Sequence, residues 1–173
     1  MATSATPDLK RLEGVVSSEV LDAMRAASAA LTKVGVRHVV VGGLAVGAHG
    51  YVRATKDVDF LVGDEAFEHH AGGVVTMRPG VPIQVGGVLV DFLSAGVGEE
   101  HLADALGTSG SVASAAVLIY LKLKSPRLKD RSDVVELIKA GIDVDLVREY
   151  LTKNASAFVV KLEEAIETAR REE

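Results

Sequence analysis

The sequence predicts an α/β protein, in which a small mixed β-sheet carries helices on one face and is followed by a helical C-terminal part. Three strand-like apolar runs support the sheet, at residues 37–41, 57–62 and 83–93. From Glu99 onward the apolar residues instead recur at helical spacing. We therefore expect a sheet-containing core over residues 1–110 and a helical part over residues 111–173, packed together as one compact unit.

Composition restricts the possible classes of protein. The 173 residues suffice for one sizeable core, and the absence of cysteine excludes disulfides, thiol catalysis and thiolate metal sites. A net charge of −5 argues against a generally basic, non-specific nucleic-acid binder, although a local basic patch stays possible. There is no apolar run of twenty residues and no signal-peptide pattern, so we expect a soluble cytoplasmic protein without a membrane partner.

The first elements follow from local signals. A helix begins at Ser17 or Ser18 and runs to about Lys33, because its apolar residues form one stripe at helical spacing. Gly35 is a suitable C-terminal stop for this helix. The run at residues 37–41 is continuously apolar, which is typical of a central strand.

Two short motifs follow that first strand. Gly42 and Gly43 place bare backbone N–H groups at the start of a helix, where a phosphate can approach closely. Asp57 and Asp59 are two residues apart on the next strand, so both side chains leave the same face while the apolar residues between and beyond them leave the other. Two such carboxylates repel each other unless a cation lies between them, and Mg²⁺, or Mn²⁺ in its place, prefers oxygen ligands of this kind.

The run at residues 83–93 predicts a hairpin, because the Gly86-Gly87 pair suits a two-residue turn. A short helix over residues 63–70 and a strand over residues 74–77 are expected before it. Asp91 interrupts the second strand of the hairpin, and a buried carboxylate needs a partner. Asp91 is therefore either a third metal ligand beside the first two acids or a residue on the exposed face of an edge strand.

These residues carry a family resemblance. The pattern Gly-Gly-Leu-Ala-Val-x-x-His-Gly-x-x-Arg-x-Thr-x-Asp-x-Asp at residues 42–59 resembles the nucleotidyltransferase fold of the polymerase-beta superfamily, and in particular the AbiEii/MenT-type toxins of toxin–antitoxin systems. The resemblance implies that residues 1–110 form a catalytic core that transfers an NMP from an NTP to an acceptor hydroxyl. The acceptor would be a tRNA, a protein or a small molecule, and a cognate antitoxin would be a partner. Asp57, Asp59 and Asp91 would hold the metal, with Asp91 near the attacking hydroxyl.

Further residues of the pattern are candidates for contacts with the nucleotide. The backbone of Gly42 and Gly43 would approach the phosphates. Arg53 and Thr55 lie just before the acids, and Arg53 either pairs with a phosphate or braces the loop. His49, a lone histidine at a helix end, is better explained as a structural hydrogen-bonding residue than as a catalyst.

A second group of polar residues lies in residues 118–133, where a lysine on a helix precedes Lys129-Asp130-x-x-Asp133. The resemblance implies that Lys122 contacts the nucleotide phosphates and that Asp130 or Asp133 orients it. The residues alone also allow Asp130 to cap a helix, Asp133 to favour the helix dipole, and Lys122 to extend from an apolar helix into solvent. Five basic residues between Lys122 and Arg131 form a local positive patch suited to a triphosphate or an RNA backbone.

Two other functions compete with nucleotidyl transfer. A catalytically silent module of the same fold would bind a nucleotide or an antitoxin, but such a loss of activity usually accompanies a missing ligand, and all three acids are present. A metal-dependent phosphohydrolase would use the same acids to activate water. The lack of further histidine and aspartate pairs makes that function less attractive.

Overall fold

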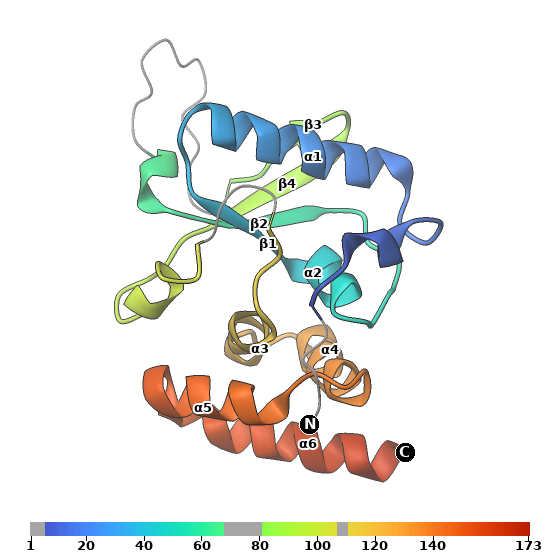
Figure 1. Ribbon diagram of the computed structural model, residues 1–173, viewed down its shortest axis with the longest axis vertical. Coiled ribbons are helices and arrows are strands. Elements are labelled where there is room, and N and C mark those ends of the chain that lie inside the picture. Colours follow the sequence, from blue (N-terminus) through green and yellow to red (C-terminus); the bar gives the residue numbers. More distant parts are fainter. Residues whose placement is uncertain (1–5, 68–80, 107–110) are drawn as a thin grey trace.

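The computed structural model describes residues 6–67, 81–106 and 111–173, and its four strands form one mixed sheet (Figure 1). The strands are β1 (His38–Val41), β2 (Val58–Val62), β3 (Ile83–Val85) and β4 (Val88–Leu93). Their order is β1-β2-β4-β3; β2 and β4 are parallel, and the two outer pairs are antiparallel. The small mixed sheet is confirmed, whereas the expected strand over residues 74–77 lies outside the described residues.

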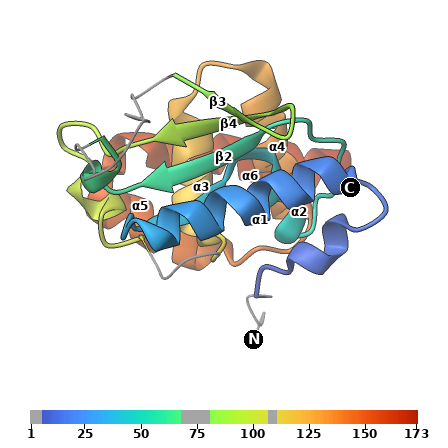
Figure 2. The same cartoon turned by 90° about the horizontal axis from the view of Figure 1, so that it is seen from above.

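Helices cover both faces of the sheet. Helix α1 (Ser18–Lys33) lies across one face, as Figures 1 and 2 show, and it packs on Val58, Phe60 and Phe92. Helices α2 (Gly42–Ala48) and α3 (Ala115–Lys124) lie on the other side. The prediction of helices on one face together with a helical C-terminal part is confirmed: α1 covers one face, and α2 with the helical part covers the other. Both faces need a cover because β1 and β2 carry apolar residues on each of them.

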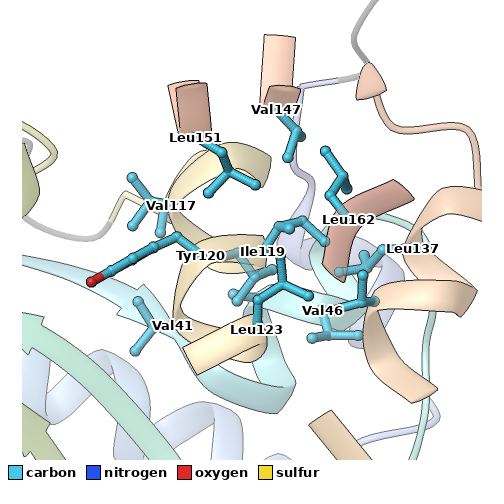
Figure 3. Packing of buried hydrophobic residues seen from close by; sticks show 14 of the residues in the cluster. Val41, Val46, Val117, Ile119, Tyr120, Leu123, Leu137, Val147, Leu151 and Leu162 are labelled. Carbon is cyan, nitrogen blue, oxygen red and sulfur yellow. The ribbon is translucent and has the colours of Figure 1, made fainter. Parts of the chain in front are cut away.

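The C-terminal part is helical as predicted. It continues with α4 (Leu128–Lys139), α5 (Val144–Asn154) and α6 (Val159–Glu172). Their apolar faces converge with that of α3, and Figure 3 shows Ile119, Leu137, Leu151 and Leu162 meeting in this cluster. Val41 of β1 belongs to the same cluster, so the helical part shares a core with the sheet. No helix in the described parts of the chain is long and apolar enough to cross a membrane.

Strand β1 lies at the end of the sheet order, not in its centre. Its outer edge is nevertheless covered, because the N–H of Val40 donates to Ser111 O and the N–H of Ala113 donates to Val40 O, both at 2.9 Å. All four residues of β1 are buried. A covered edge strand therefore has the same apolar sequence as a central strand. This explains why the expectation of a central strand at residues 37–41 was wrong.

Short elements complete the chain. The segments η1 (Leu9–Leu12), η2 (Asp64–Phe67), η3 (Glu100–Leu102) and η4 (Ser156–Phe158) are single 3₁₀ turns. The helix expected over residues 63–70 is thus a 3₁₀ turn as far as residue 67, and its remainder lies outside the described residues. The hairpin turn is as predicted: Gly86 and Gly87 have φ of 55° and 81°, which glycine adopts without strain.

Candidate active site

A cavity of about 770 Å³ lies between the sheet and the start of the helical part. The strands and the loop after α2 supply one group of its lining residues, and α3 with the α3–α4 connection supplies another. Every residue that the sequence singles out for the metal or the nucleotide lines it: Gly42, Gly43, Arg53, Thr55, Asp57, Asp59, Asp91, Lys122 and Asp130. The structure therefore brings together the two groups of residues that lie far apart in the sequence.

Asp59 and Asp91 are neighbours across the parallel pair β2 and β4, where they are register partners. Both lie on the sheet face opposite α1, since the alternate residues Val58, Phe60 and Phe92 pack with α1. Asp57 immediately precedes β2 and opens to the same cavity. Within the described residues none of these three carboxylates has a hydrogen bond or an ion pair, unlike those of Glu99 and Asp130 in the same cavity.

The three carboxylates act on one another. Burial raises the pKa of Asp59 to about 6, and repulsion from Asp91 and Asp57 adds to this increase. The positive charges of Lys122 and Arg127 oppose it only in part. An unpaired carboxylate with a raised pKa, beside two more acids in a cavity, is a physical indication of a functional site.

The donor set fits a hard divalent cation, because three carboxylates supply oxygen ligands and a charge that a cation would neutralise. In residues 6–67, 81–106 and 111–173, however, no three acidic or histidine side chains are already close enough together to hold a metal ion. A bound ion would therefore need some ligands from water or from a phosphate, as Mg²⁺ commonly does.

The two glycines of the motif leave room for neighbouring side chains. A Cβ at Gly42 would lie 2.0 Å from Asp59 Oδ2, and Gly42 has a φ of 65°. A Cβ at Gly43 would lie 2.8 Å from Thr55 Oγ1 and 3.3 Å from Arg53 Nη1. The glycines thus allow Asp59, Thr55 and Arg53 to close on the turn, and any role of the glycine backbone toward phosphate comes in addition.

Two buried aspartates hold Lys122. Its Nζ lies 2.6 Å from Asp130 Oδ1 and 2.8 Å from Asp133 Oδ2, and the lysine side chain is 8% exposed. Arg53 donates to both oxygens of Asp133, from Nε at 2.9 Å and from Nη2 at 2.8 Å. Burial opposes ionisation of Asp133, but the hydrogen bonds from Arg53 and Lys122 outweigh it and lower the pKa of this carboxyl.

Asp130 does not cap helix α4. The cap position is Arg127, and Asp130 lies in the first turn with its carboxylate directed inward to Lys122, Ser125 and Arg127. Asp133 does more than favour the helix dipole. Its ion pairs with Lys122 and Arg53 join α4 to α3 and to the loop before β2. Of the two explanations for Arg53, the structure supports the brace, although this residue also lines the cavity.

His49 has a structural contact, as expected. Its ring Nε2 lies 2.8 Å from the carbonyl oxygen of Ala113, which ties the end of α2 to the segment before α3. Burial lowers the pKa of His49, so the neutral ring with a donating Nε2–H fits this position. His49 does not line the cavity.

Sequence reasoning missed one ion pair of the cavity. Glu99 is buried and accepts hydrogen bonds from Gly96 N, Tyr120 Oη and Lys124 Nζ. Glu99 and Lys124 both line the cavity, and so do Ser125 and Arg127. The basic patch pointed to Lys124 and Arg127, whereas nothing in the local pattern around Glu99 marks it as buried.

Comparison with known proteins gives little. No family model matches the sequence, and no curated protein matches it either. Among solved structures, the chain is similar to the crystal structure of an antigenic nucleotidyltransferase-like protein from Paracoccidioides brasiliensis, over 86% of this chain and 94% of that chain. The sequences are 13% identical and the TM-score is 0.44.

Proposed function

We propose that the protein is a divalent-metal-dependent nucleotidyltransferase of the polymerase-beta superfamily, which transfers an NMP from an NTP to an acceptor hydroxyl. One observation carries the proposal. Asp59 and Asp91 are partners on adjacent parallel strands, and with Asp57 they line a cavity that also contains Lys122, Lys124 and Arg127. Unpaired acids suit a divalent cation, and basic residues beside them suit the phosphates of its nucleotide ligand.

In the proposed reaction the acceptor oxygen attacks the α-phosphorus of the NTP, and the bond to the departing pyrophosphate breaks. Asp57, Asp59 and Asp91 would hold Mg²⁺ or Mn²⁺, which when bound neutralises charge on the phosphate oxygens. Asp91 takes the proton of the attacking hydroxyl. The position of Asp91 beside Asp59 in the cavity supports such a role.

Lys122 contributes a fixed positive charge toward the triphosphate. Its ammonium has three N–H donors, and Asp130 and Asp133 occupy two of them. The third stays available to a phosphate oxygen. Arg53 acts through Asp133 and so holds the loop that carries Thr55 and Asp57 against α4. We assign the catalytic core to residues 1–110 and the closing helical part to residues 111–173.

The acceptor and the biological role follow only from the resemblance. A tRNA, a protein or a small molecule would supply the hydroxyl, and a toxin with a cognate antitoxin is the role to test first. A catalytically silent module gains no support from the position of Asp91, because this residue lies beside Asp59 rather than away from it.

Label transfer tests the proposal. The protein is incubated with Mg²⁺ or Mn²⁺, each α-³²P-labelled NTP in turn, and total tRNA. Asp59→Asn serves as the inactive variant, and Asp64→Asn, an exposed acid just beyond β2 that does not line the cavity, serves as the matched control. Label on RNA that Asp59→Asn abolishes and Asp64→Asn retains identifies a tRNA nucleotidyltransferase.

Other outcomes separate the alternatives. Label on the protein identifies a protein hydroxyl as the acceptor. Release of labelled nucleotide without transfer indicates a phosphohydrolase. If no label moves although the NTP binds in a metal-dependent manner, the acceptor is missing from the assay, and other protein or small-molecule hydroxyls are tested next. If the NTP does not bind either, the silent module is correct and the proposed enzyme is not.

A further inference from the structure

The ion pair between Glu99 and Lys124 is asymmetric. Both residues line the cavity, Lys124 from the last turn of α3 and Glu99 from the position before η3. The side chain of Glu99 is 7% exposed, whereas that of Lys124 is 51% exposed. The carboxylate is thus fixed inside the protein, and the ammonium is open to solvent at the cavity.

Glu99 is held without the help of Lys124. The N–H of Gly96 donates to Glu99 Oε2 at 2.6 Å, and the hydroxyl of Tyr120 donates to Oε1 at 2.5 Å. The Tyr120 ring is itself fixed by edge contacts with His101 and Phe158. Two neutral donors therefore still satisfy the buried carboxylate when the lysine leaves it.

The other lysines of the cavity and Arg53 differ from Lys124, whereas Arg127 is likewise exposed and pairs with the buried Asp130. Lys122 is buried and held by two carboxylates, and Arg53 is held in two places by Asp133. Lys56 and Lys129 have no ion pair with any described residue, so nothing fixes their side chains at the cavity. Lys124 alone in this group of lysines combines an exposed ammonium with a single buried partner, and its flexible stem lets it exchange that partner without backbone movement.

We propose that Lys124 is a second triphosphate-binding lysine, which exchanges its ion pair with Glu99 for one with a phosphate group of the bound nucleotide. The inference rests on the proposed function and adds a residue to that site. It concerns the phosphate chain of the ligand and not the base. In the absence of ligand, Glu99 keeps the ammonium beside the cavity, and the exchange leaves Glu99 bonded to Tyr120 and Gly96.

Inorganic triphosphate is the suitable probe, because it has no base. Its affinity is measured by calorimetry at fixed Mg²⁺ for the wild type, Lys124→Gln and Lys124→Arg. We expect Lys124→Gln to weaken binding about 10-fold, as the loss of a charge-assisted contact does, and Lys124→Arg to stay within about 3-fold. Lys139→Gln, at a lysine that pairs with Glu136 and Glu172 and does not line the cavity, should leave the affinity unchanged. Lys33→Gln at the end of α1 should change nothing.

Glu99→Gln tests the exchange itself. Glutamine still bonds with Tyr120 and Gly96 but no longer competes for the ammonium, so triphosphate should bind about 3-fold to 10-fold tighter than to the wild type. Thermal unfolding checks that each variant is folded. Weaker binding by Glu99→Gln, or unchanged binding by Lys124→Gln, overturns the inference.

The two proposals fail differently. If the wild type transfers label but Lys124→Gln binds triphosphate normally, the proposed function stands and only this inference fails. A wild type that neither binds triphosphate nor transfers label overturns both.

Discussion

The side chain of Asp59 occupies the space that a Cβ at Gly42 would need: such a Cβ would lie 2.0 Å from Asp59 Oδ2. The absence of a side chain at Gly42, in the turn between β1 and α2, therefore allows the Asp59 carboxylate to take its position. The positive φ of Gly42, 65°, makes a side chain unfavourable for a second, independent reason.

Gly42→Ala should displace Asp59 and reduce nucleotidyl transfer at least about 100-fold, since small displacements of reacting groups have large effects on rate. Label transfer measures the effect. Gly35→Ala is the matched control, because Gly35 also has a positive φ, of 76°, but nothing lies within 4 Å of its added Cβ. This control should lose about 1–2 kcal/mol of stability from backbone strain and keep its activity. Equal activity of the two variants would contradict the role of Gly42.

The stability of the metal-free protein should fall as the pH rises through about 6, because burial, Asp91 and Asp57 raise the folded-state pKa of Asp59 to about 6 from an ordinary value of 3.8. Between these two values the folded state binds more protons than the unfolded state, so stability is greatest at the acidic end of this window. The full difference amounts to about 3 kcal/mol at most.

Asp59→Asn removes this titration. In EDTA the variant should unfold at a higher denaturant concentration than the wild type at pH 8, and this advantage should shrink toward pH 4. Urea unfolding at a series of pH values measures it. A difference between the two proteins that is constant with pH would mean that Asp59 is not the titrating group.

Mn²⁺ should bind weakly to the protein alone and at least about 10-fold more tightly with an NTP present, because the described acids do not form a complete ligand set and phosphate oxygens supply the rest. Calorimetric titration of Mn²⁺, with and without a non-hydrolysable NTP, checks this expectation. Asp91→Asn should reduce the affinity in both cases, whereas Asp64→Asn should not. Equally tight binding without nucleotide would indicate a preformed metal site.

Asp133→Asn should destabilise the protein by about 3–5 kcal/mol, because it leaves the positive charges of Arg53 and Lys122 without a shared carboxylate in a buried place. Chemical unfolding measures this loss. Asp145→Asn, at an exposed acid that pairs with Arg148, should cost less than about 1 kcal/mol. A similar small loss for both variants would show that Asp133 is not a structural centre of the site.

Local signals predicted the part of the site that is local. Gly42, Gly43, Asp57 and Asp59 lie within eighteen residues of one another, at positions 42–59, so turn chemistry and strand alternation suffice to place them near one cavity. Asp91 could be inferred as well, because an acid in an apolar strand needs an explanation. The metal and nucleotide roles of these residues stay predictions.

Contacts between distant elements could not be predicted in the same way. Lys124 meets Glu99 only because α3 packs beside the segment before η3, and no spacing rule connects the two positions. Asp130 has the sequence signature of a cap, but the direction of its carboxylate depends on where α3 ends. The edge position of β1 was also hidden, since an apolar strand has the same pattern whether its edge is paired by a strand or by residues 111–113.

The parallel pairing of β2 with β4 has a consequence for the order of folding. Asp59 and Asp91 become neighbours only when β4, the second strand of the β3–β4 hairpin, has docked against β2. Pairing of strands that are distant in sequence is slow, because the intervening loop must be closed before any contact compensates its entropy. The helices and the hairpin can therefore form while the carboxylates are still apart. A nascent or partly folded chain would consequently have no assembled centre, and the proposed nucleotide chemistry would be restricted to the finished molecule.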